Sequence, residues 1–314
     1  MRAKGLLLYT GRQLAYTVPV AVAASVLVFY SLRVAPGDPV NAVLSPLAQE
    51  EARSALRDRL GLDQPVWQQY FVYIGNVFQG DFGTSLLNGN SVGSLLVEFG
   101  KRTALLAGLA LLVTYLVAIP LGVLAAVKRN TIWDQGASLI GNLGMAIPNF
   151  WLALLLILLF SVNLAILPVG GSGSASHLVL PVIVLAVEGI AVTMRVTRSS
   201  MLEQLGQDYI RTLRAKGLSA WRVVWVHGLR NALIPVISLA GLRFGWLLGY
   251  TLIVEVVFRW PGIGFLLVDS VIRRDYPVAQ TLSLVLTMTV VLGNFLANVL
   301  YAAVDPRIRA GARS

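Results

Sequence analysis

The chain has 314 residues, of which 56% are hydrophobic and only 13% are charged, and its mean hydropathy is +0.73. A soluble domain carries about 25% charged residues, so the composition excludes an ordinary soluble protein and indicates an all-α, polytopic membrane protein. The lack of cysteine excludes disulfides and thiolate sites, and we attribute the net charge of +10 to cytoplasmic loops rather than to a nucleic-acid partner.

Six charge-poor runs predict six transmembrane helices, because a bilayer core requires about 20 apolar residues for each crossing. They are about Gln13–Leu32, Thr103–Val127, Gly136–Val162, Leu178–Met194, Ala232–Val256 and Ala279–Val304. The first run follows Arg2 and Lys4 and imitates a signal peptide. It is longer than the usual core of about 7–15 residues, so we expect an uncleaved first helix.

The long segment between the first two runs, residues 33–102, is expected to form a small helical cap on the outer face. Ala48–Leu60 has a helical pattern that Gly61 would end. A second helix would start at Pro65, with aromatic residues packed against the spans, and a third piece, Val92–Phe99, leads into the second span. A plain connector is the alternative. The predicted divisions are thus 1–32, 33–102, a five-helix core at 103–304 and a tail at 305–314.

The distribution of Lys and Arg predicts the orientation. The side of the termini holds 15 of them and the other side nine, of which six lie in the 33–102 segment. Long loops count little in this rule. We therefore expect both termini, and the segment 195–231, on the cytoplasmic side.

The segment 195–231, called the basic segment below, is unusual because cations and tryptophans interrupt the apolar runs. Leu202–Lys216 has no proline and predicts a helix that Lys216 and Gly217 end, and Ser219 is a good N-cap for the next one. In that second helix one apolar face is expected, formed by Leu218, Trp221, Trp225 and Leu229. Such a face could rest on the membrane interface, dock in the groove of a partner protein or remain solvated.

A few polar or small residues inside the spans are candidates for a translocation pathway, because charges at bilayer depth usually face a bundle interior or a cavity. Glu188, Arg243 and Glu255 are alternatively structural, either as an ion pair or at the interface. Pro148-Asn149 would kink the third span, and the glycines of the fifth span would alternatively pack helices. The candidates are Pro148, Asn149, Glu188, Arg243, Gly245, Gly249 and Glu255.

Catalytic motifs are missing from the sequence. There is no GxxxxGK[ST] loop for nucleotide phosphates and no HExxH zinc motif, so we expect no catalytic or metal site and no cofactor in this chain. Energy for transport would come from another subunit. A stand-alone secondary transporter or channel is the alternative, although the two halves show no convincing repeat. A membrane enzyme or scaffold is a third class.

Eight stretches of the sequence resemble segments of the permease subunits of bacterial binding-protein-dependent ABC importers of the dipeptide, oligopeptide and nickel subfamily (dipeptide permease B-like). They are APGDPV (35–40), LGLDQP (60–65), GDFGTS (80–85), IPNFWLALLL (147–156), RAKGL with HGLRNALIP in the basic segment, EVVFRWPGIGFLL (255–267), RDYPVAQ (274–280) and DPRIR (305–309). The general coupling motif of these importers is kept at Gly217. Arg211-Thr212-Leu213 stands where the general motif has Glu-Ala-Ala, and His227–Arg230 replaces its end.

The resemblance implies a type I ABC importer permease in the bacterial inner membrane that moves peptides or a related solute by alternating access. It implies four partners besides the lipid bilayer: a homologous second permease, two cytoplasmic ATPases that bind ATP and Mg, and an extracytoplasmic substrate-binding protein. The same resemblance implies a set of residues that couple the permease to the ATPases. They are Arg211, Ala215, Lys216, Gly217, Leu218, Ser219, Trp221, Arg222 and Trp225.

Overall fold

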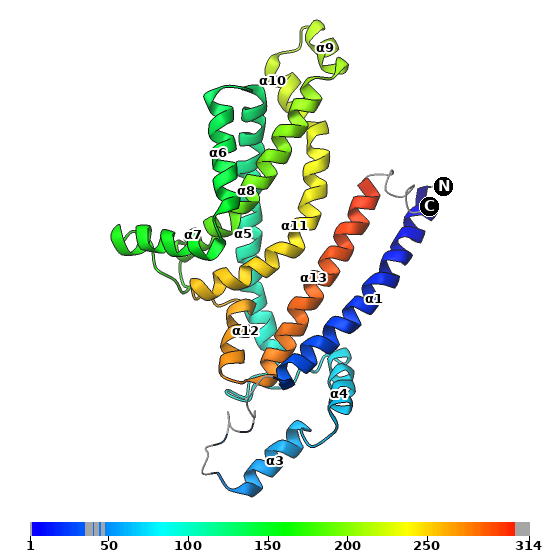
Figure 1. Cartoon of the computed structure of the whole chain (residues 1–314), viewed down its shortest axis with the longest axis vertical. Helices are drawn as coiled ribbons and strands as arrows, with labels where there is room; N and C mark the ends of the chain where they lie inside the picture. The colour runs from blue at the N-terminus through cyan, green and yellow to red at the C-terminus, as the bar shows by residue number, and fades with distance from the viewer. Residues whose placement is uncertain (1, 35–39, 41–43, 45–47, 305–314) are drawn as a thin grey trace.

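The computed structural model describes residues 2–34, 40, 44 and 48–304, and within them the protein is almost entirely helical (Figure 1). An isolated antiparallel bridge joins Thr84 to Ser91. The expectations for the APGDPV stretch at its first five residues, for DPRIR and for the tail lie outside the described residues. The elements are α1 (Arg2–Val34), α3 (Glu50–Leu60), α4 (Val66–Phe78), α5 (Val92–Val127), α6 (Ile132–Ala146), α7 (Asn149–Leu156), the π-helix η1 (Ile157–Asn163), α8 (Ser176–Leu205), α9 (Asp208–Ala215), α10 (Ala220–Arg222), the π-helix η2 (Val223–Gly228), α11 (Leu229–Val257), α12 (Ile263–Ile272) and α13 (Tyr276–Val304).

Five described helices are long and apolar enough to cross a membrane, and the bent pair α6 and α7–η1 can supply a sixth. The bend between these two is 105° and falls at Pro148, the residue before α7. Proline has no N–H for an intrahelical bond, so the break predicted at Pro148 has a local cause. The chain is therefore a polytopic all-α membrane protein.

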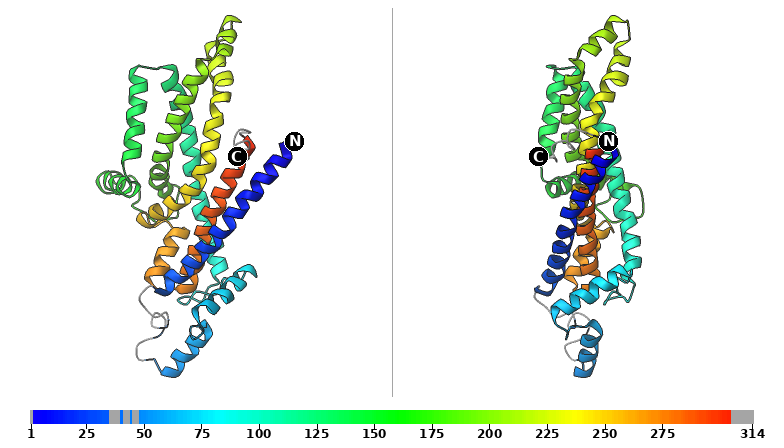
Figure 2. Two further views of the ribbon diagram at one scale, coloured as in Figure 1. Left: turned by 45° about the vertical axis from the view of Figure 1, so that its right-hand side comes forward. Right: turned by 90° about the vertical axis from the view of Figure 1, so that its right-hand side faces the viewer.

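Helices α5, α6, α8 and α11 form the packed centre of the bundle, and α1 and α13 lie side by side next to it (Figures 1 and 2). The approach of α5 to α8 requires a residue without a side chain at Gly122. A Cβ there would lie 2.7 Å from both the carbonyl oxygen of Met194 and Cβ of Thr197. In a bilayer the hydrophobic effect does not drive helices together, and small residues at such crossings stabilise their association by allowing close packing.

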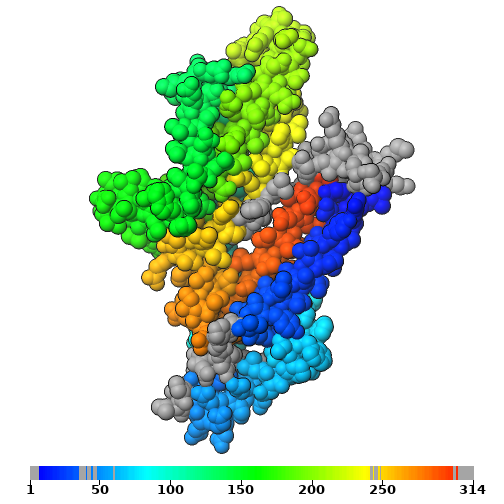
Figure 3. All heavy atoms as spheres, viewed as in Figure 1, coloured from blue at the N-terminus to red at the C-terminus, as the bar shows by residue number. Residues whose placement is uncertain are grey.

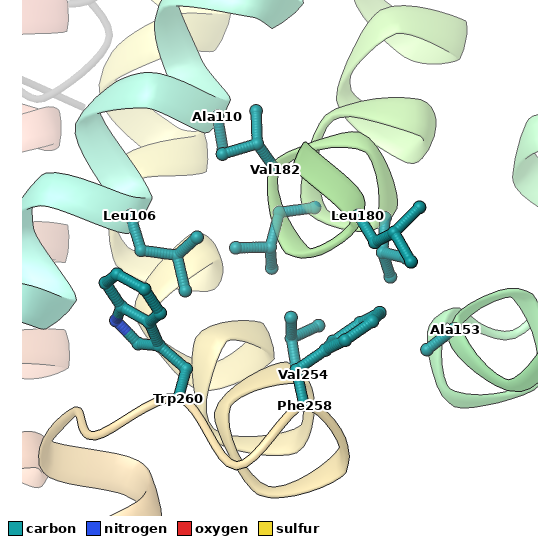
Figure 4. Close-up of a cluster of buried hydrophobic side chains, with 10 residues drawn as sticks. Leu106, Ala110, Ala153, Leu180, Val182, Val254, Phe258 and Trp260 are labelled. Atoms are coloured by element: carbon teal, nitrogen blue, oxygen red, sulfur yellow. The ribbon is translucent and has the colours of Figure 1, made fainter. Parts of the chain in front are cut away.

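The largest buried apolar cluster joins the first half of α5 to the first half of α8 and to the end of α11 (Figure 4). Leu106, Leu180 and Phe258 are almost completely buried in it. Trp260 adds an indole whose Nε1 donates to the carbonyl oxygen of Arg102 at 3.2 Å. This cluster packs three helices together at the ends that lie away from the basic segment.

The segment 33–102 contains the expected helices, although its aromatic side chains behave differently from the prediction. Gly61 ends α3 with φ of 65° and Pro65 precedes α4, while Val92–Phe99 is the first part of α5 rather than a separate piece. Of the aromatic residues expected to pack on the spans, Tyr70 packs against Phe29 of α1, with the centroids of the two rings 5.3 Å apart. Trp67, Phe71 and Phe78 are 59%, 65% and 88% exposed, so the prediction is wrong for them.

Two polar joints attach this segment to α13. Ser85 donates a short hydrogen bond to the Asp275 carboxylate, which also accepts from the Leu86 N–H at 3.0 Å. Arg33, at the end of α1, donates to Gln69 at 3.0 Å and to Gln280 at 2.8 Å. These hydrogen bonds connect the segment 33–102 to residues 275–280, and they give partners to polar groups that would otherwise be buried without one.

Glu255 forms a third joint, inside the bundle. Its side chain is fully buried and accepts hydrogen bonds from Thr103 Oγ1 at 2.6 Å and from the N–H groups of Gly264 and Phe265 at 2.7 and 3.2 Å. The two N–H groups belong to the first turn of α12, where they have no partner within the helix, and a carboxylate is a good acceptor for them. A Cβ at Gly262 would lie 2.1 Å from the carboxylate, so glycine makes room for this arrangement.

We predict that Glu255→Leu destabilises the folded protein by about 2–4 kcal/mol, because three buried donors lose their acceptor. Glu255→Gln keeps one acceptor oxygen and should cost clearly less. Melting of the purified protein in detergent measures the difference, with the exposed Glu203→Gln as control. Equal melting temperatures for Glu255→Leu and the control would contradict the structural role.

Candidate functional site

Helices α9 and α10 of the basic segment stand at one end of the molecule, beyond the ends of α6 and α13 (Figures 1 and 3). We expected a continuous helix from Leu202 to Lys216. Instead α8 ends at Leu205 and α9 begins at Asp208, so this expectation is wrong. Tyr209 holds α9 in place, because its hydroxyl donates to Gln204 at 3.0 Å and accepts from Asn231 at 3.1 Å.

The turn after α9 has the predicted backbone. Gly217 adopts φ of +80°, and its N–H bonds to the Arg214 carbonyl while the Leu218 N–H reaches the Leu213 carbonyl. This arrangement ends a helix with a left-handed residue. Ser219 occupies the N-cap position of α10 with extended dihedrals, but its side chain makes no capping hydrogen bond.

The two tryptophans point to different surroundings, so the single apolar face that we expected does not form. Trp225 and Leu229 pack against a cluster around Val123 and Met201 from α5 and α8. Trp221 is 68% exposed. The chain between the tryptophans enters the π-helix η2, whose i→i+5 bonding changes the helical register on which the expected spacing depended.

Most of the proposed coupling residues are exposed. Leu218 and Trp225 are intermediate, and the exposed ones are Arg211, Ala215, Lys216, Gly217, Ser219, Trp221 and Arg222. Within the described residues, Arg211 pairs with Asp208 at 3.4 Å, whereas Lys216 and Arg222 form no ion pair. This end of the molecule therefore exposes Trp221 near Lys216 and Arg222, two cations without an ion-pair partner among the described residues.

Arg198 does not belong to that exposed basic surface. It makes a two-pronged ion pair with the buried carboxylate of Asp134, at 2.5 and 2.8 Å. The same carboxylate accepts the N–H of Asn130 at 3.0 Å. Arg198 thus connects α8 to the first turn of α6.

A second candidate site lies between α5, α8 and α11, near the middle of the last two helices. It is a cavity of about 300 Å³ that both Glu188 and Arg243 line. Arg243 Nη2 lies 3.2 Å from Glu188 Oε1, and their side chains are 21% and 29% exposed. Gly189 makes room beside this pair for Thr114 of α5, because a Cβ at position 189 would lie 2.8 Å from Thr114 Oγ1.

Sequence reasoning missed the hydroxyl groups that share this cavity, which belong to Thr114, Tyr115 and Tyr250. The Tyr115 hydroxyl is buried and has no hydrogen-bond partner among the described residues. A signal was present: a tyrosine inside an apolar span needs a partner for its hydroxyl. The sequence could have identified Tyr115 on that ground, but not what it faces.

The other pathway candidates lie elsewhere. Pro148 and Asn149 stand at the bend before α7. Glu255 is enclosed and caps α12, so it neither reaches the interface nor lines a cavity in this conformation. Gly249 has open space around the position of a Cβ, and Gly245 is helical with surroundings outside the described residues. In the part of the chain that the structure describes, no cluster of three His, Cys, Asp or Glu could hold a metal ion.

Comparison with known proteins gives consistent matches. Residues 118–310 match the family described as "Binding-protein-dependent transport system inner membrane component", and residues 7–97 match the N-terminal region of such components. The oligopeptide transport system permease protein AppB of Bacillus subtilis (strain 168) is 40% identical, over 96% of this chain and 98% of its own. The glutathione transport system permease protein GsiC of Escherichia coli (strain K12) is 42% identical, over 97% and 99%. The GsiC of Salmonella typhi is 41% identical over the same shares.

We predict that Glu188 and Arg243 are energetically coupled. Glu188→Gln or Arg243→Gln leaves one half-buried charge without its partner, whereas the double variant leaves neither charge. The double variant should therefore destabilise the protein by less than the sum of the two single variants. The expected coupling is about 0.5–3 kcal/mol. The exposed pair Glu98 and Arg102, at 3.1 Å, is the matched control and should give no more than about 0.5 kcal/mol. Strict additivity at both pairs would contradict the prediction.

Proposed function

Because the chain belongs to the family of binding-protein-dependent transport system inner membrane components, we propose that it forms half of a pathway that imports short peptides, including glutathione. The observation that carries this proposal is the match over almost the whole length to permeases named for oligopeptide and for glutathione transport. A homologous permease would form the other half. Family membership does not favour a stand-alone transporter.

The energy would come from two separate ATPase subunits, since the sequence has no phosphate-binding loop of its own. The basic segment is the proposed contact. Trp221 offers a large exposed apolar anchor, flanked by Lys216 and Arg222, and such an anchor suits an ATPase groove with an acidic rim. Mg and ATP would be held entirely by those subunits.

The direction of transport follows from the proposed orientation. With both termini and the basic segment in the cytoplasm, residues 33–102 would lie outside, where the substrate-binding protein would deliver its ligand. ATPase closure would displace the basic segment and, with it, α8 and α11, so that the pathway alternates between its two openings. The positive-inside distribution of Lys and Arg supports this orientation.

Transport by the assembled complex tests the proposed substrate class. The permease, its partner permease, the ATPases and the binding protein would be reconstituted in proteoliposomes with ATP on the ATPase side. We expect ATP-dependent uptake of glutathione, trialanine or both, abolished when ATP is replaced by a non-hydrolysable analogue. Uptake driven by a proton gradient without ATPases, or ATP-driven uptake of neither compound, would contradict the proposal.

We predict that Trp221→Ala weakens attachment of the ATPases at least tenfold, since a large anchor in an interface commonly contributes 2 kcal/mol or more. Trp67→Ala is the matched control, because Trp67 is 59% exposed on α4 at the other end of the molecule (Figure 1). The amount of ATPase retained by affinity-purified permease gives the measurement.

Gly217→Val should give a related defect without removing an anchor. Valine is strained at φ of +80°, so the turn that presents α10 should change, and uptake per ATP hydrolysed should fall. Unchanged ATPase retention in Trp221→Ala together with unchanged coupling in Gly217→Val would contradict the proposed contact.

A further inference from the structure

The cavity between α5, α8 and α11 combines an accessible ion pair with an unused hydrogen-bonding group. Glu188 and Arg243 are bonded to each other but keep part of their side chains exposed to the cavity. The buried Tyr115 hydroxyl has no partner among the described residues. The cavity has a volume of about 300 Å³, which is at the lower end of the range typical of small-ligand pockets.

An ion pair at this position needs an explanation beyond folding. Charges within membrane-spanning segments are costly, and a buried pair often stabilises a protein less than apolar side chains of similar size would. Glu255 shows the contrasting case, because it is fully enclosed and all its contacts hold α12 and α5 in place. Glu188 and Arg243 bond only each other in the described residues, which leaves donor and acceptor capacity for a ligand.

The charges of the cavity restrict the class of ligand. An anion would pair with Arg243 and leave Glu188 unpaired, and a cation would do the reverse, at the cost of an isolated charge in a poorly hydrated place. A molecule with one ammonium and one carboxylate can pair with both side chains at once. Every charge is then paired both in the empty and in the occupied site, and the net charge of the site stays at zero.

We infer that this cavity is a substrate subsite for short peptides with both termini free, in which Arg243 binds the carboxylate and Glu188 the ammonium. Tyr115 donates a hydrogen bond to a main-chain carbonyl oxygen. In the empty site the two side chains neutralise each other, so the cavity carries no net charge between transport cycles. The inference rests on the proposed function, since it assigns a site to the proposed substrate class.

The test uses the assembled transporter in lipid nanodiscs, without ATP and without binding protein, so that binding-protein selectivity does not intervene. The probe is a tripeptide with a central benzoylphenylalanine between two alanines, in three forms: free, N-acetylated and C-amidated. After illumination, mass spectrometry locates the label on this chain. We expect the free form to label residues that line the cavity, such as Leu111, Leu185 and Leu247, and excess trialanine to suppress the label.

Loss of one charge-assisted bond should lower labelling roughly tenfold. We therefore expect a decrease of that size with either blocked peptide on the unchanged protein, and with the free peptide on Glu188→Gln or Arg243→Gln. The controls lie on α5, which also lines the cavity: Glu98→Gln and Lys101→Gln, both exposed, should label like the unchanged protein. The three peptide forms keep the test valid if a variant fails to fold.

Three results would overturn the inference. The first is no label in the cavity of the unchanged protein, and the second is equal labelling by the free and the blocked peptides. The third is that Glu188→Gln and Arg243→Gln each reduce labelling by all three peptide forms to the same extent. The last would make the ion pair a structural connection between α8 and α11. ATP-driven uptake of trialanine without label in the cavity would overturn this inference alone. Uptake of neither trialanine nor glutathione would instead overturn the proposed substrate class.

Discussion

The hydrogen bonds of the buried Glu255 carboxylate are the interaction on which the half of the bundle away from the basic segment depends. It accepts two N–H groups at the start of α12 and the Thr103 hydroxyl of α5, while Thr103 Oγ1 also accepts the N–H of Ile263 at 2.9 Å. In a membrane these donors would have no water as substitute partner. One side chain therefore fixes α5, α11 and α12 relative to each other, and the apolar cluster around Phe258 is packed against that arrangement.

The same constraint separates the charged residues of the spans into two kinds. Glu255 is saturated by donors that belong to the fold and has no exposed surface. Glu188 and Arg243 bond each other and remain partly exposed in a cavity. Hydropathy treats the three residues alike, since each is a charge in an apolar run. What distinguishes them is how fully neighbouring backbone and side-chain groups satisfy their hydrogen bonds.

Features with a local cause could be predicted from the sequence. Gly217 and Gly61 end helices through their own left-handed backbone, and Pro148 breaks the third span because it lacks an N–H. Features that depend on distant residues could not: Ser85 and Asp275 are 190 positions apart, and Thr103 and Glu255 are 152 apart. In the candidate site, the charged pair was found but Tyr115 was missed. Trp221 was placed on the wrong face because helical spacing fails in a π-helix.

The two candidate sites share helices α8 and α11, and this limits how one can affect the other. Glu188 lies about 25 Å of helix from Leu205, and Arg243 lies about 21 Å from Leu229. Tyr209 ties the two helices together at the basic segment, and the ion pair ties them again near their middles. While the ion pair is closed, both connections hold α8 and α11 together, and the two helices move most easily as one body. A displacement of the basic segment would then carry the cavity with it and change what covers its mouth. A ligand that separates Glu188 from Arg243 would remove the connection near the middles of the helices and leave the one at Tyr209.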